Sequence, residues 1–208
     1  RAVTRYWDRI THPEQVISSL PQALRTMLDP ATCGPAFLGL PQDVQAEAFD
    51  FPDEFFLPVV RHAPRPRPDL GQLQTAAEML RQAQRPLLIA GGGVHYSLAE
   101  SELGEFAERH GVPIVETVSG KASVAATHPR YCGPLGVTGA ESANQMAADA
   151  DVIVAVGTRL GDFATGSWTG FSPTAQFVGI NAALFDASKH RSLPVVGDAA
   201  VTLTELGD

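Results

Sequence analysis

The run Asp151-Val152-Ile153-Val154-Ala155-Val156-Gly157 is the clearest β-strand in the sequence. Its five consecutive apolar residues are typical of a strand that is buried on both faces of a sheet. Similar runs occur at residues 86–90, 112–116, 176–180 and 193–196, with a short strand near Gly133, and helices are predicted at 70–83, 98–110, 141–150 and 199–206. This alternation predicts an α/β fold: a doubly wound, mostly parallel six-stranded Rossmann-like sheet with helices on both faces.

The N-terminal quarter of the chain follows a different pattern. A helix is predicted over residues 13–28 and one strand over residues 36–40, and prolines then dominate residues 51–68. We therefore divide the chain into residues 1–50, a linker at 51–69 and a main domain at 70–208. With one helix and one strand, residues 1–50 have no predicted sheet of their own. We expect the strand at 36–40 to have an unpaired edge and this segment to be partly disordered or paired with another chain.

Composition excludes several classes of function. The 208 residues carry 15 basic and 23 acidic side chains, a net charge of −8, so a nucleic-acid partner is not expected. No apolar run is long enough to cross a membrane. The two cysteines, Cys33 and Cys132, are far apart and suit a reducing cytoplasm. The six histidines have no metal-ligand spacing, and no motif indicates catalytic residues, so neither a metal site nor a catalytic group is predicted within this chain.

Ligands of parallel α/β sheets bind at the carboxyl ends of the strands, so the residues that follow each strand are the candidates for a binding site. Gly91, Gly92 and Gly93 either form a tight turn or offer backbone N–H groups to a phosphate. His95, shortly after them, could face the same site. The other candidates are Thr117, Val118, Gly157, Arg159, Asp162, Asn181 and Asp198.

Three of these candidates have a structural alternative that the sequence leaves open. Arg159 could clamp an anion, or it could pair with Asp162. Asn181 and Asp198 could bind ribose hydroxyls, or each could cap the helix that follows it. The basic stretch Arg61–Pro68, with its alternating prolines, is interpreted as linker and not as a phosphate clamp.

Several segments together resemble the thiamine-diphosphate-dependent decarboxylase and acetolactate synthase superfamily. Residues 34–44 look like the last strand of its N-terminal, pyrimidine-binding domain, and residues 85–93 and 149–160 look like strands of its central domain. Within the superfamily, residues 4–10, 40–47, 157–168, 181–190 and 197–199 are similar to the hydrolases that open a cyclic 1,2-diketone in inositol degradation. The Gly166-Ser167-Trp168 loop is the most specific of these features.

The resemblance implies a parent enzyme that uses thiamine diphosphate and magnesium and acts on a small diketone. It also implies that the activating glutamate lies before Arg1 and the magnesium motif after Asp208, so we expect the chain alone to be inactive. The central domain would be largely structural and would contact other domains and subunits of a cytoplasmic homo-oligomer. Its nucleotide-contact positions match the candidates above. Because flavin-binding relatives usually carry Asp where this chain has Asn181, FAD is disfavoured and an adenine nucleotide stays open.

Two alternatives remain at this point. The parent could be an acetolactate synthase-like enzyme with an adenine-nucleotide or FAD site, although the Gly-Ser-Trp loop and Asn181 argue against it. The chain could instead be a free-standing nucleotide-binding or transhydrogenase-like module. The incomplete segment at residues 1–50 argues against this second alternative.

Overall fold

The computed structural model describes residues 2–208, and the chain divides into two compact units, one ending at Pro64 and the other spanning Arg65–Asp208. Each unit is described by itself. Within the described residues, no helix combines the length and the apolar character that a membrane span requires.

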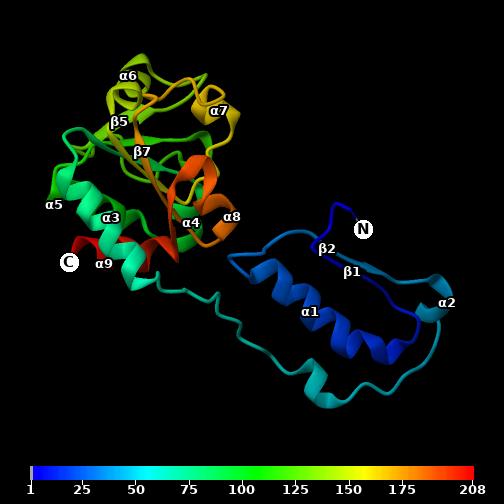
Figure 1. The fold of residues 1–208 in the computed structure, drawn as a ribbon. Coiled ribbons are helices and arrows are strands. Elements are labelled where there is room, and N and C mark those ends of the chain that lie inside the picture. The colour runs from blue at the N-terminus through cyan, green and yellow to red at the C-terminus, as the bar shows by residue number, and fades with distance from the viewer. Residues whose placement is uncertain (1) are drawn as a thin grey trace. The chain divides into compact units, whose positions relative to one another are not determined.

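The second unit is built on one six-stranded parallel sheet. Its strands are β3 (Pro86–Ala90), β4 (Ile114–Glu116), β5 (Tyr131–Pro134), β6 (Val152–Val156), β7 (Gln176–Asn181) and β8 (Leu193–Val196). They are arranged in the order β5-β4-β3-β6-β7-β8, and every neighbouring pair is parallel. This arrangement confirms the predicted doubly wound sheet, including the short strand near Gly133 (Figure 1).

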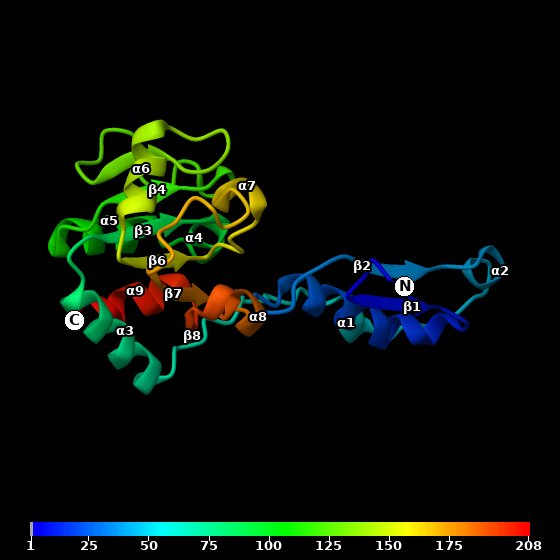
Figure 2. The same cartoon turned by 45° about the horizontal axis from the view of Figure 1, so that its top comes forward.

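Helices cover both faces of this sheet. One face packs against α3 (Leu70–Gln82), α5 (Glu100–His110) and α9 (Ala199–Gly207), and the other against α6 (Glu141–Asp149). Figures 1 and 2 both show α6 on the side of the sheet opposite α3 and α9. Because side chains alternate along a strand, Leu88 of β3 lies in one core and Leu87 in the other.

Short helical segments follow the carboxyl ends of the strands. They are α4 (Gly92–Ser97), the 3₁₀ turn η3 (Val118–Gly120), α7 (Asp162–Thr165), α8 (Leu184–Ala187) and the 3₁₀ turn η4 (Lys189–Arg191). The sequence predicted none of them, because three to six residues are too few to display a helical period. These segments form the edge at which the candidate site residues lie.

The first unit contains a small sheet that the sequence analysis missed. It comprises β1 (Tyr6–Arg9), η1 (Pro13–Gln15), α1 (Val16–Leu28), β2 (Ala36–Gly39), α2 (Gln42–Gln45) and η2 (Asp53–Phe56). β1 and β2 pair in parallel, so the prediction of a single strand without a sheet was wrong. β1 was missed because its sequence, Tyr-Trp-Asp-Arg, includes two charged residues. The carboxylate of Asp8 accepts a hydrogen bond from Ser19 of α1 at 2.5 Å.

The last residues of the predicted linker are attached to the second unit. The backbone N–H of Asp198 donates to the Pro66 carbonyl at 2.8 Å. The Arg65 guanidinium pairs with the Asp198 carboxylate at 2.9 Å, and Arg67 pairs with Glu205 of α9. Two of the three arginines of Arg61–Pro68, Arg65 and Arg67, are therefore paired with carboxylates of the second unit.

Candidate functional site

The carboxyl edge of the sheet is the place where the topology would put a ligand. The chain runs from β3 outward through β4 to β5, and then returns to the centre at β6 and runs the other way through β7 to β8. The loops after β3 and β6 therefore diverge at a topological switch point, where ligands of such sheets bind. All ten predicted cofactor-binding residues lie in or next to the segments that follow the strands on this edge.

The triple glycine and Gly157 pack against one another at this switch point. The N–H of Gly91 donates to the Val156 carbonyl, and that of Gly93 to the Gly157 carbonyl, both at 2.8 Å. A Cβ added at Gly93 would lie 2.5 Å from the Gly157 Cα, and one at Gly91 would lie 2.5 Å from the Gly157 oxygen. The glycines thus allow the backbone after β3 to pass in direct contact with the backbone after β6. Two of the N–H groups that a phosphate would need are already used inside the protein.

Thr117 and Val118 follow β4 in the neighbouring loop. Thr117 is buried, and its hydroxyl accepts a hydrogen bond from the Gly120 N–H at 3.2 Å, so it caps the η3 turn. Its own N–H donates to the Ala90 carbonyl at the end of β3 at 2.9 Å. Val118 is 73% exposed. Thr117 therefore holds the loop in place, while Val118 faces solvent.

Arg159, Asp162 and Asn181 lie around the end of β6. Arg159 and Asp162 are both exposed, and they do not form an ion pair with one another in residues 2–208. The Asn181 amide donates to the Thr158 carbonyl at 3.3 Å and accepts from the Ala183 N–H at 3.1 Å. Asn181 thus connects the loops after β6 and β7, and the Arg159 side chain is accessible to an anion.

Asp198 acts as a helix cap in this structure. One carboxylate oxygen accepts from the N–H groups of Ala200 and Val201 at the start of α9, at 3.1 and 3.2 Å. The other accepts from the Ser97 hydroxyl at 2.5 Å and from Arg65 at 2.9 Å. With both oxygens engaged and the residue buried, the capping alternative for Asp198 is the one observed.

Exposed apolar side chains gather on the same edge, and the sequence analysis did not single them out. At least one follows each strand from β3 to β7, and the most exposed are Tyr96 at 92% and Phe185 at 79%. The full set is Tyr96, Leu98, Val118, Val137, Phe163, Leu184 and Phe185. The signal in the sequence was a large apolar residue in the turn after a strand, where polar residues are usual.

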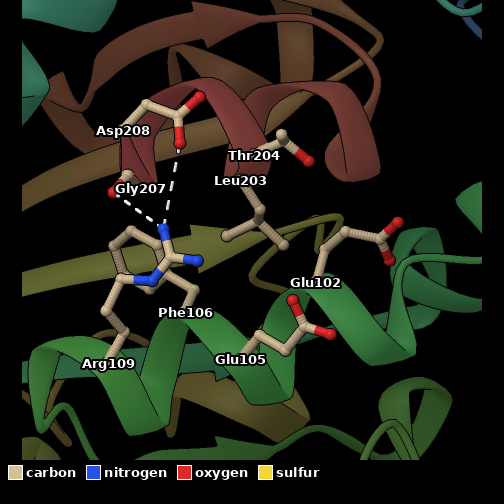
Figure 3. Close-up of a pocket in the computed structure, with 8 residues that line it drawn as sticks. All are labelled: Glu102, Glu105, Phe106, Arg109, Leu203, Thr204, Gly207 and Asp208. Atoms are coloured by element: carbon tan, nitrogen blue, oxygen red, sulfur yellow. Dashed lines mark hydrogen bonds and ion pairs between the residues drawn. The ribbon is translucent and has the colours of Figure 1, made fainter.

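Two hollows in the second unit lie away from the candidate residues. The first, of about 70 Å³, lies between α5 and α9, where Arg109 donates to the Gly207 carbonyl at 3.1 Å (Figure 3). The second, of about 380 Å³, lies between α5 and residues 122–128. None of the ten predicted residues lines either hollow. No three metal-ligating side chains among residues 2–208 come together to hold an ion.

Two hydrogen-bonded pairs of titratable groups flank the loop after β4. Glu116, at the end of β4, accepts from the Tyr131 hydroxyl at 2.6 Å and from the Ala122 N–H at 2.8 Å. Burial, together with the bond to Glu116, raises the pKa of Tyr131 to about 12. His95 lies 2.8 Å from Glu100, and this hydrogen bond raises the pKa of the imidazole above its ordinary value. Of these four groups, the sequence analysis considered only His95 as a residue that could face the site.

Comparison with known proteins places this chain in a family. A family model described as the central domain of thiamine pyrophosphate enzymes matches residues 73–206. Curated relatives named 3D-(3,5/4)-trihydroxycyclohexane-1,2-dione hydrolase are 46% identical in Bacillus velezensis and 44% identical in Bacillus subtilis, in each case over 99% of this chain and 32% of the relative. The chain therefore spans about a third of the length of these relatives.

A solved structure supports the same assignment. An X-ray structure of a thiamin diphosphate-dependent enzyme isolated from Mycobacterium smegmatis aligns with a TM-score of 0.76 and 27% identity, covering 97% of this chain and 38% of that one. The hydrolase relatives do not favour an acetolactate synthase-like parent or a free-standing nucleotide-binding module. Because the family model covers more than half of the residues, the chain belongs to the thiamine pyrophosphate enzyme family, and residues 73–206 are a central domain of that family.

Proposed function

We propose that this chain is the central region of a thiamine-diphosphate-dependent hydrolase that opens trihydroxycyclohexanedione to 5-deoxyglucuronate in inositol degradation. The observation that carries the proposal is the identity of 44–46% to the named hydrolases, which extends over both units of the chain. The Mycobacterium smegmatis enzyme matches nearly the same residues at 27%. A shared fold alone would not produce the higher identity.

In this proposal the central domain is structural, and the chemistry takes place on other parts of the enzyme. The ring opening adds one water and breaks one C–C bond, and thiamine diphosphate supplies an electron sink for that cleavage. The family resemblance assigns thiamine diphosphate and magnesium to segments outside residues 1–208. The residues of this chain hold the loops of the carboxyl edge in position and contact other domains and subunits of a cytoplasmic homo-oligomer.

A chimera tests the proposal. Residues 1–208 replace the aligned segment of the Bacillus subtilis hydrolase, and a control chimera receives the aligned segment of the Mycobacterium smegmatis enzyme. We expect the first chimera to bind thiamine diphosphate and open the diketone ring at a rate within about tenfold of the parent, a change of about 1.4 kcal/mol in the barrier. The control chimera should lose more of the ring-opening activity. A first chimera that binds the cofactor but does not open the ring contradicts the proposal.

The isolated chain provides a second test of the same proposal. Residues 1–208 assayed with thiamine diphosphate, magnesium and the diketone should give no turnover. Any turnover that depends on the cofactor would show that the chemistry resides in this chain, and the structural role would then be wrong.

A second candidate function is an adenine-nucleotide site on the carboxyl edge. It is supported by the exposed side chains of Tyr96 and Val118, which could contact an adenine, and of Arg159, which could contact a phosphate. The N–H groups of Gly91 and Gly93 and the Asp198 carboxylate do not fit this role, because each is bonded within the protein. A nucleotide would therefore be held mainly by side chains and not by a glycine cradle.

Calorimetric titration of the chain with ADP, FAD and NAD in turn tests this second candidate. We expect saturable binding of ADP that weakens at least tenfold in Arg159→Ala, while Arg81→Ala, a change in the distant helix α3, leaves it unchanged. If none of the three produces heat, or if Arg159→Ala binds as tightly as the unaltered chain, the nucleotide site is wrong and the domain is a scaffold alone.

A further inference from the structure

The His95 side chain lies between two groups that can only accept hydrogen bonds. Its Nδ1 is 2.8 Å from Oε1 of Glu100, at the start of α5, and its Nε2 is 3.0 Å from the backbone carbonyl oxygen of Lys121, in the loop after β4. His95 itself belongs to α4, which follows β3. One imidazole ring thus bridges two segments that are 21 residues apart in the sequence.

The protonation state of the ring decides whether both bridges exist. An ionised carboxylate and a backbone carbonyl have no proton to donate, and a neutral imidazole carries one N–H. A neutral His95 can therefore donate to Glu100 or to Lys121, but not to both. Only the imidazolium, which has an N–H on each nitrogen, makes the two hydrogen bonds that the geometry shows.

The charged groups around His95 favour the cation. Glu100 faces it from α5, and Glu116 acts on it from the end of β4. At the end of α4, Ser97 donates a hydrogen bond to Asp198, the residue that caps α9, and Arg65 neutralises this carboxylate. The Lys121 side chain is exposed, and its loop reaches His95 through the backbone carbonyl.

The loop that His95 holds is one of the loops of the candidate edge. It begins at Thr117 and Val118 and passes through Gly120, where an added Cβ would lie 2.1 Å from the Ala90 oxygen. Ala122 has a left-handed backbone, with φ of 68°, and its N–H is held by Glu116. The loop is therefore fixed at its base by backbone contacts and at Ala122 by Glu116, and His95 holds the residue in between, at Lys121.

We propose that His95 is a proton-operated tether, which fastens the loop of residues 117–123 to the α4–α5 corner when its ring is protonated and releases one of these attachments when it is not. The release leaves the β3 and β4 strands and the glycine contacts intact. Its effect is confined to the carboxyl edge. The tether depends on this chain alone and not on the proposed activity.

The direction of the pH dependence follows from the pKa shifts of His95 and Glu100. The hydrogen bond to Glu100, opposed by burial, raises the pKa of His95 above its ordinary value of 6.5. Burial of Glu100 opposes ionisation, but the hydrogen bond from His95, the hydrogen bond from the backbone N–H of Glu100 and the charge of His95 together outweigh it, so the pKa of Glu100 is lowered. Since the folded pKa of His95 exceeds the unfolded one, the stabilisation is fully present below pH 6.5 and is lost as the pH rises through the folded pKa.

NMR titration of the uniformly ¹⁵N-labelled chain from pH 5 to pH 9 tests the tether. We expect the two ring nitrogens of His95 to be protonated together at acidic pH, with a midpoint above 6.5, and the amide signals of residues 118–123 to shift with the same midpoint. A midpoint at or below 6.5, or loop amides that do not follow the ring, would overturn the proposal.

A matched pair of variants separates the tether from general effects. Glu100→Gln should lower the His95 midpoint and weaken the coupled shift of the loop amides, whereas Glu105→Gln, five residues further along α5, should change neither. Signals of the other five histidines report whether each variant keeps the fold. If Glu100→Gln does not fold, the titration of the unaltered chain still decides the question. An unchanged His95 midpoint in a folded Glu100→Gln contradicts the proposal.

Discussion

The two units of the chain differ in how much apolar surface they bury. In Arg65–Asp208, β3 and β6 consist almost wholly of buried residues, and helices or loops cover both faces of the sheet. In the unit that ends at Pro64, only Ile10 and Ala23 are buried apolar side chains among the described residues. Five of its larger apolar side chains in α1 and around β2 are 36–52% exposed: Leu24, Met27, Leu28, Phe37 and Leu40.

This difference indicates that a pair of parallel strands is not a folding unit by itself. Parallel strands are stable where both faces of the sheet are covered, and β1 and β2 have α1 on one side only. Residues 65–208 hold a complete core, whereas residues 2–64 hold part of one. We propose that residues 1–50 are the C-terminal part of a pyrimidine-binding domain, as the resemblance of residues 34–44 implies.

The largest effect on folding is expected when the two units are separated. Residues 65–208 expressed alone should unfold in one cooperative transition, and residues 1–64 alone should show none. Each fully buried apolar side chain contributes about 1.5–3 kcal/mol, whereas ordering each backbone residue costs about 1–2 kcal/mol, and α1 alone has 13 residues. Circular dichroism during thermal unfolding measures both pieces.

Hydrogen exchange in the whole chain provides the control for that experiment. The amides of β2 should exchange much faster than those of β6 in a chain shown to be monomeric. Strong protection of residues 36–39 under these conditions, or a cooperative transition in residues 1–64 alone, would mean that the small unit is stable by itself and that the comparison is wrong.

A smaller but still large effect on stability is expected where Gly157 packs against Gly93. Gly157→Ala should lower the unfolding free energy of the second unit by about 2–4 kcal/mol, since its Cβ would lie 2.5 Å from the Gly93 Cα and its φ is 60°. Gly161→Ala is the matched control. A Cβ there meets nothing within 4 Å, so the change should stay within about 0.5 kcal/mol. Urea unfolding measures both, and equal losses would contradict this account.

A moderate effect is expected at Asp198, which joins three segments of the second unit. Asp198→Ala removes the cap of α9 and the acceptor for Ser97 and Arg65, and should cost about 2 kcal/mol. Asp198→Asn keeps a capping oxygen and should cost about half as much. Asp149→Ala, at an exposed position in α6, is the control. If Asp198→Asn and Asp198→Ala are equally destabilised, the cap is not the main contribution.

The contrast between the units also explains what could be read from the sequence. The second unit was predictable because its buried strands are continuous apolar runs, and β3 and β8 were placed at their observed residues, 86–90 and 193–196. β1 was not predicted, because it has only four residues and two of them, Asp8 and Arg9, are charged. A strand of this length has too few side chains to establish a period.

The candidate site was predictable in position but not in role. The rule that ligands bind after parallel strands located Gly91, Gly157 and Asp198 on one edge. It could not show that the N–H groups of Gly91 and Gly93 are bonded to the end of β6 and to Gly157 after it, or that Asp198 is held by Ser97, 101 residues away in the sequence. Such contacts depend on how the loops pack, and no local pattern encodes them.

The smallest expected effect concerns the left-handed turn after α7 in the second unit. Gly166, Ser167 and Trp168 have φ of 55°, 54° and 66°, and the turn is held by hydrogen bonds from the N–H groups of Trp168 and Gly170 to Thr165. Glycine adopts this backbone without the steric cost of a Cβ, so Ser167→Gly should raise the unfolding free energy by about 0.5–1 kcal/mol.

A Ser→Gly substitution in a helix should change the unfolding free energy in the opposite direction. Ser101 is exposed in α5, and Ser101→Gly should lower the unfolding free energy by up to about 1 kcal/mol, because glycine loses more backbone entropy in a helix. Since both changes remove one exposed serine side chain, a difference in sign isolates the backbone contribution at Ser167. Two losses of equal size in urea unfolding would show that the turn at residues 166–168 is not strained.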